Sequence, residues 1–424
     1  MFNKISIFLF SILPISLIIG NFAINLNILL LDVLALGFCY KTKNWNWIKE
    51  SVFKLLIVFY IYIIANSIIS FYLLDFSNYD GIIRSVTFIK FIFFAYTFKI
   101  LILEEKILEK IIKYWFLIIG IIIFDIFFES FFGHNIVGYV SPDKTRIVSF
   151  FKDELVVGGL ILCFGFILTT YFLNKNLKFS TKLFFNIFLF AIPIIILITG
   201  ERSNFIKSFI IFSFIIFYIN QKKLLFNKKK FFLLLIIAFI SLNFLSEKVY
   251  VKQTEFFYRF LKIAKDDDDY IHGNNFFSKF QNIKYFAHYD VAIKIFKEHP
   301  LLGVGNKNFR HECSNDKYFD KKIKLTNLRC NTHPHQVHFE LLSEHGLIGY
   351  LLFIYLIFTA IRKFIAENKI YKNVFYYSAT IYLIVFLVPI LPSGSFFSTF
   401  NGTLFWLIFS IANSNKSKLK KSNL

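Results

Sequence analysis

The sequence is poor in charged residues. Only 18% of its 424 residues are Asp, Glu, Lys or Arg, whereas 56% are hydrophobic. Soluble domains are about one-quarter charged, so a soluble fold would have no place for this much apolar surface. The apolar residues, among them 61 phenylalanines, occur in blocks separated by short Lys-rich or Asn-rich stretches. This segmentation is typical of a polytopic membrane protein.

Several other features are absent. No small-residue cleavage site follows the first apolar block and a second block begins at once, so we expect a membrane span there and not a signal peptide. No period indicates a repeat array. The sequence also lacks the paired interrupted segments of a secondary transporter. The four aspartates at 266–269 lack the glycine spacing of a calcium loop, so we interpret them as a solvated charge run.

Twelve apolar blocks are long enough to cross a hydrocarbon core of about 30 Å. The sequence therefore predicts an all-α membrane protein with about twelve transmembrane helices, near 5–20, 22–40, 54–74, 82–103, 111–132, 155–173, 183–200, 203–220, 231–245, 346–361, 374–391 and 397–411. The fourth block contains Arg84 and Lys90. A Lys or Arg at a helix centre costs about 3 kcal/mol on insertion scales. We expect these side chains to snorkel, or this span to begin later.

The net charge of +21 is concentrated in short connections. Residues 247–344 hold 16 Lys and Arg against 13 Asp and Glu, so they contribute +3 and the remaining +18 lies elsewhere. The basic residues follow the even-numbered expected spans, at 41–49, 106–113, 175–182, 222–230, 362–372 and 416–421. By the positive-inside rule both termini are cytoplasmic. Residues 247–344 then lie on the extracytoplasmic side. We therefore attribute the basic net charge to the cytoplasmic connections of a bacterial inner-membrane protein and not to a nucleic-acid partner.

This topology divides the chain into three regions. Residues 1–246 form helices 1–9, residues 247–345 form a periplasmic loop, and residues 346–424 form helices 10–12 with a basic cytoplasmic tail. Periodic stretches in the loop, at 256–263, 285–296 and 335–344, predict amphipathic helices on the membrane mouth.

Cysteine is also scarce, with four residues in the chain. Cys39 and Cys163 fall in expected spans, whereas Cys313 and Cys330 fall in the outer loop. That compartment is oxidising in a Gram-negative cell, which favours a disulfide between them over two free thiols. Closing a ring of this size contributes about 3 kcal/mol in the chain-entropy model.

Histidine and buried acid residues are the candidates for chemistry. Six of the nine histidines fall in two stretches of the outer loop, 296–313 and 330–349: His299, His311, His333, His335, His338 and His345. We interpret His333, His338 and His345 as structural, because no carboxylate or cysteine completes a zinc spacing. Asp125 and Glu129 in the fifth span are either functional or paired with Lys90 or Lys99.

One run of residues carries a family resemblance. His335 and Gln336, followed after nine residues by Gly346 and after two more by Gly349, resemble the signature of O-antigen ligases and related polymerases. The sequence "GVG" at 303–305 is similar to the Gly-x-Gly of that family, and "TGERSN" at 199–204 resembles its arginine-bearing motif. Gln336 stands where the family usually has Asn. The resemblance implies the fold of a lipid-linked glycosyltransferase.

The resemblance also implies an activity. Enzymes of this kind move a glycan from undecaprenyl diphosphate to a sugar hydroxyl, here of lipid A core or another glycan acceptor, with inversion and without a metal or cofactor. The polymerases use the same donor. Such a transfer needs a base for the hydroxyl and cations for the leaving diphosphate. We expect His335 as the base and Arg202 and Arg310 as the cations, because a guanidinium suits paired phosphate oxygens.

Three further residues are expected to bind substrate. Arg146 lies in an outer connection, His288 lies in the outer loop, and Gln336 follows the proposed base. Apart from the glycan donor, the acceptor and membrane lipids, the sequence indicates no partner. A transporter is the alternative from another class, and it would place its polar residues near the bilayer midplane.

Overall fold

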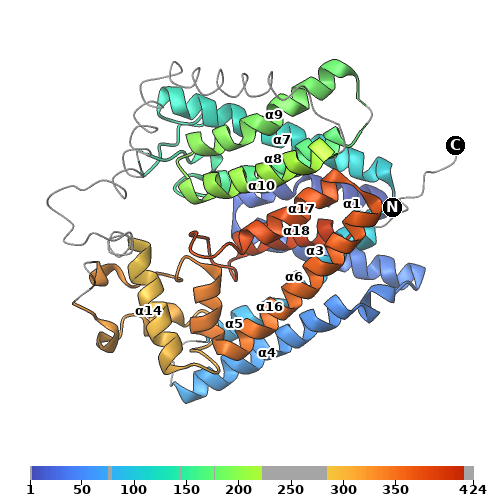
Figure 1. The fold of residues 1–424 in the computed structure, drawn as a ribbon. Helices are drawn as coiled ribbons and strands as arrows, with labels where there is room; N and C mark the ends of the chain where they lie inside the picture. Colours follow the sequence, from blue (N-terminus) through green and yellow to red (C-terminus); the bar gives the residue numbers. More distant parts are fainter. Residues whose placement is uncertain are drawn as a thin grey trace.

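The computed structural model describes residues 2–74, 79–143, 145–175, 177–221, 284–321, 323 and 325–414. Within these ranges every regular element is a helix, which confirms the all-α class. Figure 1 shows α7 to α10 on one side, α3, α6, α17 and α18 in the middle, and α4 and α16 on the other side. Helix α14 and its loops lie at one end of these long helices, and the N-terminus lies at the other.

Seven helices of the described residues are long and apolar enough to cross a membrane, or eight if the bent pair α1 and α2 is one span. Two shorter apolar helices, α8 and α17, and the 15-residue α18 accompany them. Their bounds are α1 (Phe2–Ser11), α2 (Leu13–Ile19), α3 (Asn21–Thr42), α4 (Ser51–Leu73), α5 (Asp80–Thr87), α6 (Ile89–Leu101), α7 (Glu105–Phe132), α8 (Val157–Leu173), α9 (Phe179–Ile198), α10 (Arg202–Gln221), α16 (Val337–Tyr371), α17 (Val374–Phe386) and α18 (Thr399–Asn413).

These helices coincide with eleven of the expected spans. The ninth expected span, 231–245, lies outside the described residues, as do the aspartates at 266–269 and the expected helix at 256–263. The count of twelve and the placement of the whole outer loop therefore stay predictions.

Two of the expected spans are broken. Helices α1 and α2 meet at 43°, where Pro14 occupies the first turn of α2. A proline is tolerated there because the N–H it lacks would have no helical partner. The fourth span consists of α5 and α6, and the Lys90 Nζ donates to Asn25 Oδ1 of α3 at 2.5 Å. The sequence had predicted either snorkelling side chains or a later start of this span, but α5 begins at Asp80 and the charge of Lys90 has a partner within the bundle.

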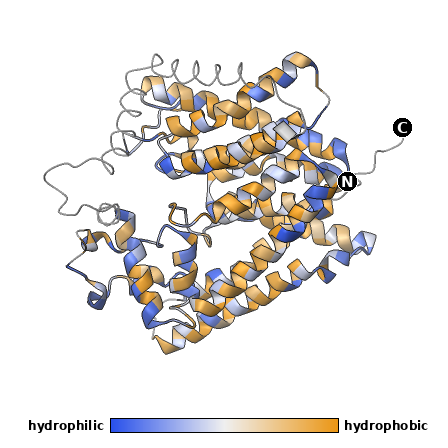
Figure 2. Cartoon of the chain, viewed as in Figure 1, coloured by the Kyte–Doolittle hydropathy of each residue, from blue (hydrophilic) through white to orange (hydrophobic). Residues whose placement is uncertain are grey.

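Aromatic side chains fill the centre of the bundle. The rings of Phe88 and Trp406 lie 5.9 Å apart between α6 and α18, and Phe396 packs on both. Figure 2 shows hydrophobic residues along the long helices and hydrophilic residues gathered around α14 and its loops. The polar end is the part of the molecule where the sequence predicted the outer loop.

The described part of that loop forms a small subdomain. It consists of α14 (Lys284–Glu298), α15 (Phe309–Glu312) and the short helices η3 (Asp316–Tyr318) and η4 (Thr326–Leu328). Its own apolar core includes Val291, Ile295, Phe309 and Tyr318. Helix α14 contains the amphipathic stretch expected at 285–296.

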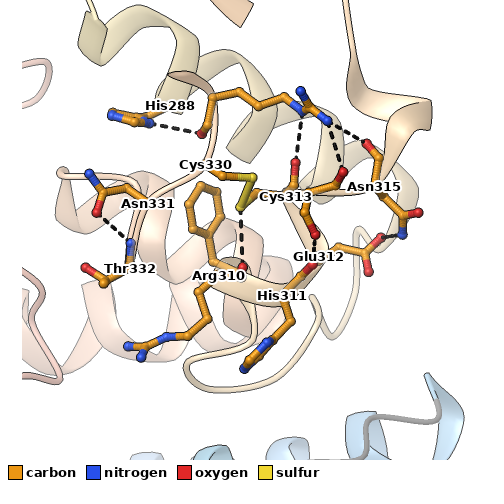
Figure 3. The surroundings of a disulfide bond; sticks show 12 residues. His288, Arg310, His311, Glu312, Cys313, Asn315, Cys330, Asn331 and Thr332 are labelled. Atoms are coloured by element: carbon orange, nitrogen blue, oxygen red, sulfur yellow. Dashed lines mark hydrogen bonds between the residues drawn. A yellow bond between two sulfur atoms is a disulfide. The ribbon is translucent and has the colours of Figure 1, made fainter. Parts of the chain in front are cut away.

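A disulfide joins Cys313, directly after α15, to Cys330, shortly after η4, as Figure 3 shows. Their Cα atoms are 5.3 Å apart, within the range of ordinary disulfides. The Arg329 guanidinium donates to the carbonyls of Cys313 and Ser314, each at 3.0 Å. These bonds hold Arg329, at the end of the segment between the cysteines, against residues 313–314 at its start. Residue 329 lies six positions before His335.

Helix α16 is interrupted at Gly346, where φ is 61°. At this break the segment 300–305 exchanges hydrogen bonds with the helix. The N–H groups of Val304 and Gly305 donate to the carbonyls of Ser343 and Glu344, at 2.9 and 2.7 Å. The N–H groups of Leu347 and Ile348 donate to the carbonyls of Pro300 and Leu301, at 2.8 and 3.3 Å. In an unbroken helix, residues 347 and 348 would donate to 343 and 344, so the segment 300–305 satisfies the groups that the break exposes.

Glycine is required on both sides of this crossing. Gly346 and Gly303 have φ of 61° and 67°, a region that other residues rarely adopt. A Cβ on Gly303 would lie 2.6 Å from the Ser343 carbonyl oxygen, and one on Gly346 would overlap the Leu301 carbonyl. The first glycine of the "GVG" motif and the first glycine of the Gly-x-x-Gly motif therefore serve one backbone crossing.

We predict that Gly346→Ala destabilises the protein. The left-handed backbone alone costs about 1–3 kcal/mol for a residue with a Cβ, and the overlap with Leu301 adds to this cost. The melting temperature of the detergent-purified protein should fall by roughly 5 °C or more. Gly120→Ala is the matched control, because a Cβ there meets nothing within 4 Å and alanine favours a helix. Equal melting temperatures for the two variants would contradict this account of the crossing.

We also predict that Cys313 and Cys330 resist alkylation in intact cells until a reductant is added, because both thiols are engaged in the disulfide. Mass spectrometry of the labelled peptides measures this directly. Labelling of both cysteines without reductant would show that they are free thiols in the cell.

Candidate functional site

A cavity of about 370 Å³ lies where α8, α10, α17 and α18 meet the outer subdomain. Its polar lining comes from several parts of the chain and includes Arg146, Glu201, Ser203, Asn204, Lys207, Tyr285, His333, His335, Tyr382, Ser393 and Asn401. Its apolar lining includes Leu155 before α8 and the helical residues Leu162, Ile211, Val385, Phe386 and Leu404. The cavity is thus amphipathic, and its volume is in the range of small-ligand sites.

His335 lines this cavity just before α16 begins. Its backbone is left-handed, with φ of 58°, and its carbonyl accepts from the Ser393 N–H at 2.7 Å. Its ring lies 4.2 Å from that of His333, 5.3 Å from that of His288 and 5.4 Å from that of Tyr285, measured between centroids. The structure therefore brings together two of the expected site residues, His335 and His288, with His333, which we had interpreted as structural.

Burial lowers the pKa of both cavity histidines. The pKa of His335 falls to about 3, first because burial disfavours the charged ring and then because His333 and His288 lie beside it. Burial likewise lowers the pKa of His333 to about 4. Both rings are neutral at pH 7 and each has a nitrogen lone pair, which a base requires.

Gln336 serves as a helix cap. Its side-chain oxygen accepts from the N–H groups of His338 and Phe339, at 2.6 and 3.2 Å. The residue is buried and is not among those that line the cavity. A side-chain acceptor at this position satisfies N–H groups that have no partner inside the helix.

Arg146 lines the cavity from the connection between α7 and α8. Two acids of α7 hold this connection. Glu129 accepts from the N–H groups of Val148 and Ser149, at 3.1 and 2.6 Å. Asp125 accepts from the Ile136 N–H at 2.8 Å and from the Ser149 hydroxyl at 2.5 Å.

Asp125 and Glu129 thus act as anchors of the segment that carries Arg146. The two lysines considered as their partners make other contacts: Lys90 donates to Asn25, and Lys99 pairs with Glu50.

The "TGERSN" motif begins α10 and borders the same cavity. Glu201 accepts from the Gly158 N–H at 2.6 Å and from Asn204 Nδ2 at 2.5 Å. Lys207, one turn further along α10, is buried, and its Nζ donates to the Pro392 carbonyl at 3.1 Å. Arg202 is exposed in the first turn of α10, and its neighbours Glu201 and Ser203 line the cavity in its place.

Arg310 lies on α15, next to the disulfide. Figure 3 shows its side chain extending away from the Cys313–Cys330 bridge, and it is not among the residues that line the cavity. The structure thus brings Arg146 and His335 to one cavity but does not bring Arg310 there.

Sequence reasoning missed Glu201 and Lys207 as site residues. A signal for Lys207 was present, because it is the only charged residue within 203–220 and an ionisable residue inside a span is a functional candidate by default. It also missed Lys307 and Glu340, which form a buried ion pair at 3.0 Å. No periodicity distinguishes these two residues from solvated ones, since their pairing depends on the fold.

The comparison with protein families agrees with this geometry. Residues 187–354 match the family model described as O-Antigen ligase. The matched range begins in α9 and ends in α16, and it includes Lys207, His335 and the glycines of the backbone crossing. No curated protein matches the chain. Residues 187–354 are thus similar to the O-antigen ligase family, a match that indicates a membrane glycosyltransferase of the ligase or polymerase type, and the described residues contain seven or eight helices able to cross a membrane.

Proposed function

We propose that the protein transfers a glycan from undecaprenyl diphosphate to a sugar hydroxyl of lipid A core, on the outer side of a bacterial inner membrane. One observation carries the proposal: a single cavity is lined by His335, by the basic side chains Arg146 and Lys207, and by an apolar wall. The apolar wall suits the polyprenyl end of such a donor, and Arg146 and Lys207 suit its diphosphate.

The reaction follows from this arrangement. The acceptor oxygen forms a bond to the anomeric carbon of the donor while the bond from that carbon to the diphosphate oxygen breaks. The hydroxyl proton goes to the free nitrogen of His335. Arg146 and Lys207 stabilise the negative charge that develops on the departing undecaprenyl diphosphate. A single displacement of this kind inverts the anomeric centre, and with two cations in place we propose that it proceeds without a metal.

The electrostatics of His335 support a role as base. With a pKa near 3 in the free protein, the ring is unprotonated at pH 7 but weakly basic. An anionic diphosphate at Arg146 and Lys207 would raise this pKa, because a nearby negative charge favours the imidazolium. The base therefore gains strength when the donor is bound, which is when it has to accept a proton.

The two arginines expected to hold the diphosphate, Arg202 and Arg310, have different roles in this proposal. Arg202, exposed beside the lining residues Glu201 and Ser203, is proposed to meet the diphosphate at the mouth of the cavity. The role expected for Arg310 is proposed instead for Arg146 and Lys207. His288 is proposed to support the ring of His335, and Gln336 to hold its backbone.

The membrane topology is part of the proposal. We propose cytoplasmic termini, helices 1–9 within 1–246, a periplasmic catalytic loop at 247–345 and helices 10–12 within 346–424. The lysine distribution supports this orientation, and so does the position of α14 at the end of the bundle away from the N-terminus (Figure 1).

The first prediction from this proposal concerns lipopolysaccharide in the bacterium that encodes the protein. Deletion of the gene should leave full polymer on undecaprenyl diphosphate and uncapped core, and a plasmid copy should restore capped core on a gel. Core capped by a single unit would instead identify a polymerase.

A copy with His335→Ala should fail to restore capping, and its turnover in a purified assay should fall by about 10²- to 10⁴-fold.

His338→Ala is the control for loss of a ring. The His338 Nε2 contacts the Leu387 carbonyl at 2.8 Å and its Nδ1 contacts the Tyr350 hydroxyl at 3.2 Å, and it is not a lining residue. This variant should melt at a lower temperature but transfer glycan near the parental rate. Parental turnover of His335→Ala would remove His335 from the mechanism.

The second prediction separates the arginines. Arg146→Lys keeps the charge but loses the planar fork that binds two phosphate oxygens, so kcat/KM should fall by roughly tenfold or more. Arg310→Lys is the matched control and should retain nearly all activity, because Arg310 lies outside the cavity. A larger fall in kcat/KM for Arg310→Lys than for Arg146→Lys would instead assign diphosphate binding to Arg310.

A further inference from the structure

A buried ion pair lies near the cavity without lining it. Lys307 Nζ and Glu340 Oε1 are 3.0 Å apart, and the exposed fractions of their side chains are 3% and 0%. Removing two charges from water is costly, and a buried pair is often no more stabilising than apolar residues of the same volume. The pair therefore calls for an explanation beyond stability.

The contacts of Glu340 supply one. Besides Lys307, its carboxylate accepts from the Ser395 hydroxyl and from the Phe396 N–H, the latter at 2.8 Å. Lys307 also bonds the Ser395 hydroxyl, and its own backbone is left-handed with φ of 62°. The ion pair thus holds residues 395–396, in the connection between α17 and α18, by hydrogen bonds.

The same connection holds His335. The Ser393 N–H donates to the His335 carbonyl at 2.7 Å. The preceding carbonyl, of Pro392, accepts from Ser203 Oγ at 2.5 Å and from Lys207 Nζ at 3.1 Å. Residues 392–396, which we call the clamp segment, are therefore fixed by α10 at one end and by the ion pair at the other, with the His335 backbone between them.

We propose that Glu340, paired with Lys307, is a positioning residue that fixes His335 through the clamp segment. His335 has a left-handed backbone, a conformation that persists in a residue other than glycine only when its surroundings impose it. A ring displaced by about 1 Å loses on the order of 10²-fold in rate. This inference rests on the proposed role of His335 as base.

The test is a double-mutant cycle on kcat, using the full-length protein in detergent with undecaprenyl-linked glycan. Ser395→Ala removes one bond to Glu340 but leaves the ion pair intact. It should lower kcat by about 10- to 100-fold with little change in the KM for the donor. In a His335→Ala background it should lower kcat by less than about twofold, because the group that it positions is gone. Ser395→Thr, which keeps the hydroxyl, should restore most of the rate.

Two further variants sharpen the test. Glu340→Gln should also lower kcat when His335 is present and have little effect in the His335→Ala background. This variant leaves Lys307 buried without its partner, so if it fails to fold, Ser395→Ala alone provides the test. Ser343→Ala is the matched control: this buried serine is on α16, and its hydroxyl bonds to the Phe339 and Glu340 carbonyls of the same helix. It should leave kcat at the parental value in both backgrounds.

The outcomes separate the two proposals. Equal losses from Ser395→Ala with and without His335 would overturn the positioning role while leaving the proposed function in place. A parental rate for Ser395→Ala would also overturn it. A parental rate for His335→Ala would overturn both the base and the residue proposed to position it.

Discussion

The site depends on the exchange of hydrogen bonds at the break in α16. The carbonyls of residues 343 and 344 and the N–H groups of 347 and 348 would satisfy one another in a continuous helix, and the segment 300–305 would then have no partner there. Because Gly346 turns the backbone, these groups bind the segment 300–305. The outer subdomain is thereby joined to the bundle at α16, the helix that His335 precedes. Tyr62 and Asn66 of α4 reinforce the joint, by bonds to the carbonyls of His345 and Leu302 at 2.6 Å each.

Buried carboxylates hold the backbone around the cavity, where the helices end near the edge of the membrane. Non-helical chain is tolerated at membrane depth only where its N–H and carbonyl groups have partners. Glu129 binds the backbone of 148–149, Glu201 binds that of Gly158, and Glu340 binds that of Phe396. Each acid lies at or near a helix end. Glu129 and Glu340 each fix a connection near the cavity, and Glu201 fixes the first turn of α8. An ionised carboxylate suits this task because it accepts several hydrogen bonds at once.

The sequence predicted those features that depend on local pattern. Apolar blocks located the helices, although α16 extends about ten residues beyond the expected span at each end, and the His-Gln run with its glycines indicated the family. Features that depend on contacts between distant segments were not predictable in this way. The sequence favoured Arg202 as the catalytic cation and gave Arg146 only a binding role. The cavity lining instead contains Arg146, because the α7–α8 connection packs against the start of α10, where the Ile147 N–H donates to the Thr199 carbonyl at 3.2 Å. The pairing of Lys307 with Glu340 likewise joins residues 33 positions apart.

The surroundings of His335, the proposed base, differ from those of the base in a hydrolytic triad. There a carboxylate bonds the ring, orients it and stabilises its charged form. In the described residues no ion pair joins the His335 ring to an acid; the nearest fixed contacts are to its backbone carbonyl and to the rings of its neighbours. In the proposed mechanism the clamp segment and the adjacent rings orient the imidazole. The charge of Glu340 already raises the pKa of His335 against the larger effect of burial, and the diphosphate of a bound donor would raise it further. An empty cavity then keeps the ring unprotonated, so its lone pair is available when a donor and an acceptor arrive.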